Sequence, residues 1–222
     1  MTSRDDADRD TETLTLDGAS ARRWLAEFVA GFGREARRLG DLDRQAGDGD
    51  FGTNLTSALA KAERFVAELE PDSFADVFDA VSKGFLDTGG TSGPLFGMFF
   101  REVGKAARPT GLVDVATLAA GVVSGLAVIQ RLGHASVGDS TMVDAIAPAA
   151  SALAAAGERG DDLAAALAAA TTAAQEGAES TRDLLASRGR ASYVGEVARG
   201  VLDPGAVTVA LFFAAGAAAV RT

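Results

Sequence analysis

The sequence contains no cysteine and a single histidine, His134, among its 222 residues. The missing cysteine excludes disulfides, thiol nucleophiles, iron–sulfur clusters and cysteine-bound zinc. A single histidine excludes every mechanism that needs two. His134 stands in a polar stretch, so a surface or helix-end position is a better interpretation than a ligand or a base.

Positive charge is also scarce. Lys and Arg number 21 against 31 Asp and Glu, which gives a formal net charge of −10. This balance repels nucleic-acid backbones and anionic lipid, so we expect no nucleic-acid and no membrane partner. The longest apolar stretches, 115–129 and 205–220, are shorter than the roughly 20 apolar residues that span a bilayer. Residues 1–12 lack the apolar segment of a secretory signal, and we expect a cytoplasmic protein.

Length and patterning indicate one helical domain. We predict a flexible acidic N-terminal tail over 1–12 and one domain over 13–222. Apolar residues recur at helical spacing, without sustained period-2 alternation, which predicts an all-α fold of about eight helices. Asp17 or Ser20 is the expected cap of the first helix, and Asp114 that of a later one. The predicted helices run to about 39, over 54–69, 72–85, from 94, over 114–132, to 156, over 161–187 and over 206–220.

The unusual residues stand in four connections between these alanine-rich helices, so we expect the functional site at the helix ends. The first connection, 40–54, reads GDLDRQAGDGDFGTN and is too rich in Gly and Asp for a regular helix. Glycines there let the carboxylates of Asp43, Asp48 and Asp50 converge, and such hard oxygen ligands suit Mg²⁺. On spacing alone, a solvated Asp-Gly turn with a capping role is an equally good interpretation. No strand precedes this GxGxxG, so it is not a dinucleotide fingerprint.

The other three connections are less specific one by one. Residues 89–93 (GGTSG) precede a helix start that could cradle an anion, although such a turn is usually only a connection. In 138–141 (GDST), an N-cap by Asp139 or Ser140 is the better interpretation. Arg188 and Arg190 would supply positive charge to a phosphate, or would complement a helix C-terminus.

Four segments in register resemble the DhaL-type nucleotide-binding subunit of dihydroxyacetone kinase, from about Leu16 to the C-terminus. They read LDRQAGDGDFGTNL, GGTSGPLFGMFF, GDSTMVDAIAPA and GRASYVGEVARGVLDPGA. The resemblance implies a barrel-like bundle of eight antiparallel helices, with the nucleotide site in the loops at one end.

The resemblance also implies the ligands and their contacts. It implies ADP or ATP bound through two Mg²⁺ ions that Asp43, Asp48 and Asp50 hold. Residues expected near the phosphates are Gly52, Thr53, Asn54, Thr91, Ser92 and Arg190. Residues expected along the adenine and ribose are Gly133, Met142, Asp203, Pro204 and Gly205. No residue of this chain is expected to be catalytic in the covalent sense, because positioning and charge neutralisation carry phosphoryl transfer.

In this family the ketose is held by a separate DhaK-type subunit or domain, so the resemblance implies a phosphotransferase subunit that is active only with a partner. A DhaM-type phosphocarrier would rephosphorylate bound ADP in one branch, and ATP would exchange in the other. We expect a homodimer or a heterocomplex. Phe51, Ser140 and Val197-Ala198 depart from the family pattern and remove positive charge. A divergent nucleotide-binding regulator, or an ATP-dependent kinase subunit for another ketose or polyol, is therefore the alternative.

Overall fold

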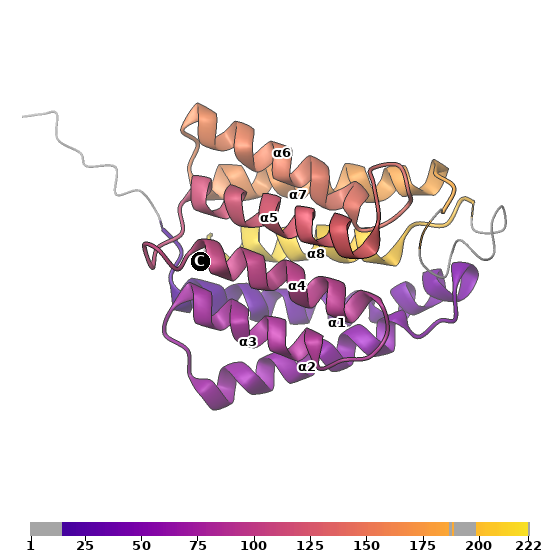
Figure 1. Cartoon of the computed structure of the whole chain (residues 1–222), viewed down its shortest axis with the longest axis horizontal. Helices are drawn as coiled ribbons and strands as arrows, with labels where there is room; N and C mark the ends of the chain where they lie inside the picture. Colours follow the sequence, from indigo (N-terminus) through magenta and orange to yellow (C-terminus); the bar gives the residue numbers. More distant parts are fainter. Residues whose placement is uncertain (1–14, 187, 189–198, 222) are drawn as a thin grey trace, which may run out of the picture.

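The computed structural model describes residues 15–186, 188 and 199–221, and it places eight α-helices and one 3₁₀ turn there. Figure 1 shows the helices aligned along the long axis of the molecule. The all-α prediction and the number of helices are confirmed. The elements are α1 (Gly18–Ala46), α2 (Phe51–Leu69), α3 (Phe74–Leu86), α4 (Ser92–Ala106), α5 (Val115–Gly133), α6 (Val143–Arg159), α7 (Leu163–Ser180), η1 (Thr181–Asp183) and α8 (Pro204–Ala219).

The helices close into a barrel. Each helix packs against the next along the chain, and α8 packs against α1. At this closure the indole of Trp24 stacks on Phe212 with ring centroids 4.8 Å apart, and its Nε1 donates to the Phe212 carbonyl at 2.8 Å. Phe28, Phe78 and Phe100 surround Phe212 with further ring contacts. The aromatic residues therefore form the centre of the core, and the connecting loops lie at the ends of the bundle.

Helix α5 has 19 residues, and its length and composition alone would let it cross a membrane. The apolar stretch 115–129 is shorter than a membrane span, but the helix that contains it continues to Gly133, one residue past the predicted end at 132. Helix α5 packs against α4 and α6, and 44% of its apolar window is buried. One such helix is weak evidence for a membrane span, since core helices of other proteins pass the same test.

Several helix boundaries differ from the prediction by three residues or more. Residues 40–54 are mostly helical, because α1 continues to Ala46 and α2 begins at Phe51. Propensity argued against Gly40 in a helix, but close packing of α1 on α2 outweighs a cost of about 1 kcal/mol. The predicted helix over 161–187 ends at Ser180, where the buried Thr181 starts the 3₁₀ turn. Residue 187 lies outside the described residues.

Three caps agree with the sequence. Asp17 accepts from the backbone N–H of Ser20, and Asp114 accepts from that of Thr117. His134 is the exposed C-cap of α5 with φ 51°, a helix-end position as expected. The division between tail and domain at residues 12 and 13 lies outside the described chain and stays a prediction. Leu16, which pairs with Val113, is already part of the fold.

Candidate functional site

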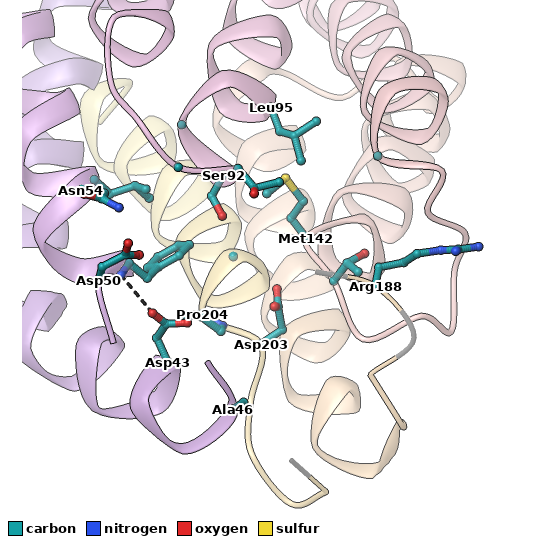
Figure 2. A pocket seen from close by; sticks show the side chains of 18 of the residues that line it. Asp43, Ala46, Asp50, Asn54, Ser92, Leu95, Met142, Arg188, Asp203 and Pro204 are labelled. Atoms are coloured by element: carbon teal, nitrogen blue, oxygen red, sulfur yellow. Dashed lines mark hydrogen bonds between the residues drawn. The ribbon is translucent and has the colours of Figure 1, made fainter. Parts of the chain in front are cut away.

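A cleft opens at the end of the bundle where the four glycine-rich connections meet. Figure 2 shows Asp43 and Asp50 on one side of it, with Met142 and Arg188 on the other. Segments far apart in the sequence line it together, namely the α1–α2 link, residues 89–93, residues 140–142, Arg188 and residues 203–205. The cleft lies at the helix ends, where the functional site is expected.

Three carboxylates converge at the α1–α2 link. Asp43 lies in the last turn of α1, Asp48 in the link, and Asp50 at the N-cap of α2. One oxygen atom from each lies within 4.8 Å of the other two. Asp43 is half-buried, whereas Asp48 is exposed.

Glycine and a backbone hydrogen bond explain this convergence. Gly49 has φ 79°, a left-handed conformation that strains other residues. A Cβ on Gly47 would lie 2.6 Å from Oδ1 of Asp43, so a side chain there would displace the carboxylate. Oδ2 of Asp43 accepts from the Phe51 N–H at 3.0 Å, which fixes it beside the start of α2 (Figure 2).

The capping interpretation is therefore confirmed in part, because Asp43 accepts a hydrogen bond from the first N–H of α2. Asp50, which occupies the N-cap position, makes no capping hydrogen bond with its side chain. Three like charges this close repel one another unless a cation lies among them. The donor set consists of hard carboxylate oxygens, so these residues fit a magnesium-type divalent cation.

The second wall is the glycine-rich loop before α4. Thr91 is the N-cap of α4 and Ser92 its first residue, and both line the cleft. Gly90 has φ 85°, and a Cβ on it would lie 3.2 Å from Nδ2 of Asn54. The first N–H groups of α4 have no partner within the helix. The residues that carry them line the cleft, so the positive end of the helix dipole lies at the same cleft as the carboxylates.

The opposite wall is mainly apolar. Met142 is 6% exposed and packs against Gly205, where a Cβ would lie 3.4 Å from the Met142 side chain. Gly133 and Pro204 line the same wall. A flat apolar group, such as a nucleobase, fits against a thioether and glycine backbone of this kind.

Two acidic side chains, Asp144 and Asp203, accept hydrogen bonds from the backbone next to this wall. The buried Asp144 accepts from the N–H groups of Gly138 and Thr141, at 2.6 and 2.8 Å. Asp203 accepts from the Ala206 N–H at 2.7 Å and begins α8. Burial raises the pKa of Asp203 to about 7, and the charges of Asp144 and Asp43 add to this shift against the opposing N–H of Ala206.

The predicted N-cap at Asp139 or Ser140 was wrong. Helix α6 begins at Val143 with Met142 at its N-cap position, and Asp144 receives the N–H groups of the preceding turn. Ser140 instead has φ 58°, is 8% exposed, and donates to the Thr181 carbonyl at 3.3 Å. Tertiary contact with the 3₁₀ turn outweighs its preference for a cap.

The predicted site residues fall into three groups. Gly52 and Thr53 do not line the cleft, since Gly52 is buried against α1 and Thr53 is exposed. Arg190 lies outside the described residues, so its role stays a prediction. The remaining predicted residues line the cleft, namely Asp43, Asp48, Asp50, Asn54, Thr91, Ser92, Gly133, Met142, Asp203, Pro204 and Gly205.

Arg188 lines the cleft and forms an ion pair with Asp139, with Nε and Oδ2 3.5 Å apart. Its side chain extends away from Asp43 and Asp50 (Figure 2). Sequence reasoning missed the apolar lining residues Ala46, Leu55, Leu95, Ile129 and Ala135. In sequence they are indistinguishable from core, and the one available signal was that Ile129 stands one turn before Gly133.

Comparison with known proteins assigns the fold and site to a family. A family model for the DAK2 domain matches residues 45–218. The chain therefore belongs to the DAK2 domain family. In this chain the matched domain is a closed helical bundle with the cleft at its loop end.

Individual relatives point to one kind of subunit. The chain is 36% identical over 201 residues to "PEP-dependent dihydroxyacetone kinase 1, ADP-binding subunit DhaL" of Listeria innocua, covering 90% of this chain and 96% of that protein. It is 30% identical to the ADP-binding subunit DhaL of the PEP-dependent dihydroxyacetone kinase of Escherichia coli, covering 88% and 94%. Both relatives match along almost their whole length.

A solved structure agrees with the fold. The dihydroxyacetone kinase of C. freundii, in complex with AMP-PNP and Mg²⁺, superposes with a TM-score of 0.69 at 27% identity. The match covers 98% of this chain and 37% of that one, so this fold forms about a third of the larger enzyme. The predicted DhaL-type resemblance is confirmed.

Proposed function

We propose that this chain is the Mg²⁺-dependent nucleotide-binding subunit of a dihydroxyacetone-type kinase. It delivers a phosphoryl group from bound nucleotide to a small ketose held on a DhaK-type partner. One observation carries the proposal: three carboxylates converge in the cleft that the N-terminus of α4 also faces. Without a cation these aspartates repel a diphosphate, and with one they bind it.

The proposed division of roles rests on the lining of the cleft and on the family resemblance. Asp43, Asp48 and Asp50 hold Mg²⁺, which neutralises phosphate charge and orients the transferred group. Two ions are proposed on the family resemblance alone. Thr91 and Ser92 donate to the phosphates, and Met142 with 203–205 contacts the base. Gly52, Thr53 and Arg190 are proposed phosphate neighbours on the family resemblance.

The donor and the partners are part of the proposal. The Listeria and Escherichia relatives are named PEP-dependent and ADP-binding, which supports ADP as a retained coenzyme that a DhaM-type carrier rephosphorylates. ATP as an exchanging donor is the alternative. The ketose site lies on the DhaK-type partner, and the chain works in a heterocomplex or as a homodimer. A cytoplasmic location agrees with the cysteine-free composition.

Magnesium removal tests the proposal directly. With Mg²⁺ present, ADP or ATP should raise the melting temperature, and EDTA should abolish the shift. Asp50→Asn should lose this shift while its ligand-free melting temperature stays equal or rises, because the variant removes one of three repelling charges. Glu35→Gln is the matched control, since it removes an α1 carboxylate that pairs with Arg38 outside the cleft. Wild-type protein that shows no shift with either nucleotide would contradict the proposal.

A nucleotide-binding regulator is a second candidate, favoured by the charge of the cleft. Among the described residues, four aspartates and a single arginine line it. Mixing the chain with a DhaK-type subunit, dihydroxyacetone and either ATP or a phosphotransferase relay distinguishes the two. Ketose phosphate formation supports the kinase subunit, and intact nucleotide binding without product in either assay supports the regulator.

A further inference from the structure

Lys61 connects two walls of the cleft from outside its lining. It lies on α2, two helical turns beyond Asn54. Its Nζ donates to the Asp87 carbonyl at 2.5 Å and to Oγ1 of Thr88 at 3.3 Å. Asp87 and Thr88 lead from α3 into the glycine-rich loop. Lys61 therefore holds the beginning of that loop against α2.

Thr88 is a firm attachment point for this contact. It is 7% exposed, and its Oγ1 donates to the Gly84 carbonyl at 3.0 Å. The Thr88 carbonyl lies close to Gly93, where a Cβ would come within 3.2 Å of it. The loop between these residues is short, with Thr88 hydrogen-bonded to α3 at one end and Gly93 in the first turn of α4 at the other. A shift at Thr88 is therefore expected to move Thr91 and Ser92.

Helix α2 contacts this loop at a second point, and its N-terminus lies at the aspartate cluster. Its backbone packs closely on α3, since a Cβ on Gly84 would lie 2.5 Å from the Ala62 nitrogen. Gly90, within the loop, packs on Asn54 in the first turn of α2. Asp50 is the N-cap of the same helix. Helix α2 therefore contacts the glycine-rich loop before α4 and has Asp50 of the carboxylate cluster at its own N-terminus.

We propose that Lys61 is a positioning residue for the nucleotide phosphates. It fixes residues 88–92 relative to α2, so that Thr91 and Ser92 donate to the same phosphate groups that the aspartate-bound cation meets. This inference rests on the proposed function of the cleft. A charge-assisted hydrogen bond at the C-terminal end of α3 is strong enough for such a tether.

A role confined to capping α3 makes a different prediction. Loss of a cap lowers stability and leaves the relation between loop and metal site unchanged. Loss of a tether loosens one loop and weakens ligands in proportion to their phosphate contacts. The two roles therefore differ in which ligands lose affinity and in which part of the chain loosens.

The test compares Lys61→Met with the wild-type chain by calorimetric titration of Mg·ADP and of adenosine. The affinity for Mg·ADP should fall about tenfold, as when a supporting residue behind a metal site is removed. The affinity for adenosine should be unchanged, and Lys61→Arg should recover most of the loss for Mg·ADP. Arg64→Met is the matched control, because Arg64 lies on the same helix in an exposed pair with Glu68 and should behave as wild type.

Hydrogen exchange of the ligand-free protein supplies a readout that needs no nucleotide. Lys61→Met should speed exchange of the 89–93 amides and leave α5 to α7 unchanged. Wild-type Mg·ADP affinity with unchanged exchange, or equal losses for ADP and adenosine, would overturn the inference. If the wild-type chain fails to bind Mg·ADP, the proposed function fails instead, and the exchange experiment still tests the tether.

Discussion

Asp203 combines two opposing demands in one carboxyl group. As the N-cap of α8 it accepts from the Ala206 N–H, which favours the charged form. Burial disfavours that form, as do the charges of Asp144 and Asp43, and the pKa rises to about 7. The folded state therefore binds this proton more tightly than the unfolded state. The contribution of this proton to the stability of the fold is fully present below the unfolded pKa of 3.8 and is lost as the pH rises through the folded pKa of about 7.

Asp203→Asn should therefore stabilise the metal-free protein at high pH. Asparagine keeps the cap but carries no charge, so the variant should melt higher than wild type at about pH 8 in EDTA. The difference should narrow as the pH falls toward about 4, which melting curves across this range would measure.

The control for this prediction is Asp162→Asn, an exposed N-cap that accepts from the Ala165 N–H in the same way. Its difference from wild type should change much less with pH. If the melting temperatures of wild type and Asp203→Asn change with pH in parallel, the pKa of the Asp203 carboxyl is not raised.

At the scale of elements, the contact between α1 and α2 decides how the carboxylate link is held. Gly52 faces α1 so closely that a Cβ would lie 2.4 Å from the Ala36 carbonyl oxygen. The family pattern suggested a phosphate contact for Gly52, and the structure supplies a packing reason for the same glycine. Close approach here brings the end of α1, with Asp43, beside the start of α2.

Gly52→Ala should destabilise the protein by about 1–3 kcal/mol, because the helices must move apart. Gly33→Ala is its matched control on α1. A Cβ there meets nothing within 4 Å, so alanine should stabilise by about 0.5–1 kcal/mol. Urea denaturation measures both free energies. Equal effects of the two substitutions would contradict the packing argument.

Much of the element pattern was predictable. Asp114 was predicted as a cap, and Asp17 as one of two candidates with Ser20, because a short side-chain acceptor before an apolar run satisfies the first N–H groups. The exception was 40–54, where glycine and aspartate favoured a loop. Local propensity is a weak signal there, since burial of Leu39 and Gly40 against neighbouring helices extends α1.

At the scale of the whole molecule, closure of α8 on α1 holds the barrel together. Phe212 occupies the meeting point, with ring contacts to aromatic residues of α1, α3 and α4. The same closure brings Asp203, at the start of α8, into the cleft that begins at Asp43. Core and site therefore depend on one topological feature.

Phe212→Ala should cost about 3–5 kcal/mol of unfolding free energy, since it opens a cavity where several helices meet. Leu69→Ala, at a side chain 61% exposed, should stay within about 0.5 kcal/mol of wild type. Denaturant unfolding followed by the single tryptophan measures both. A small effect at Phe212 would mean that the closure is not central to stability.

The sequence by itself determined the helical class, the capping aspartates and the three carboxylates in a glycine-rich link, because periodicity, side-chain chemistry and glycine freedom act locally. Tertiary structure alone decided that residues 43–50, 89–93, 140–142 and 203–205 share one cleft, since only closure of the barrel brings these distant helix ends together. It also decided the boundaries around Gly40 and the role of Asp144 in place of Asp139 or Ser140. These depend on packing against helices far along the chain, which no local pattern records.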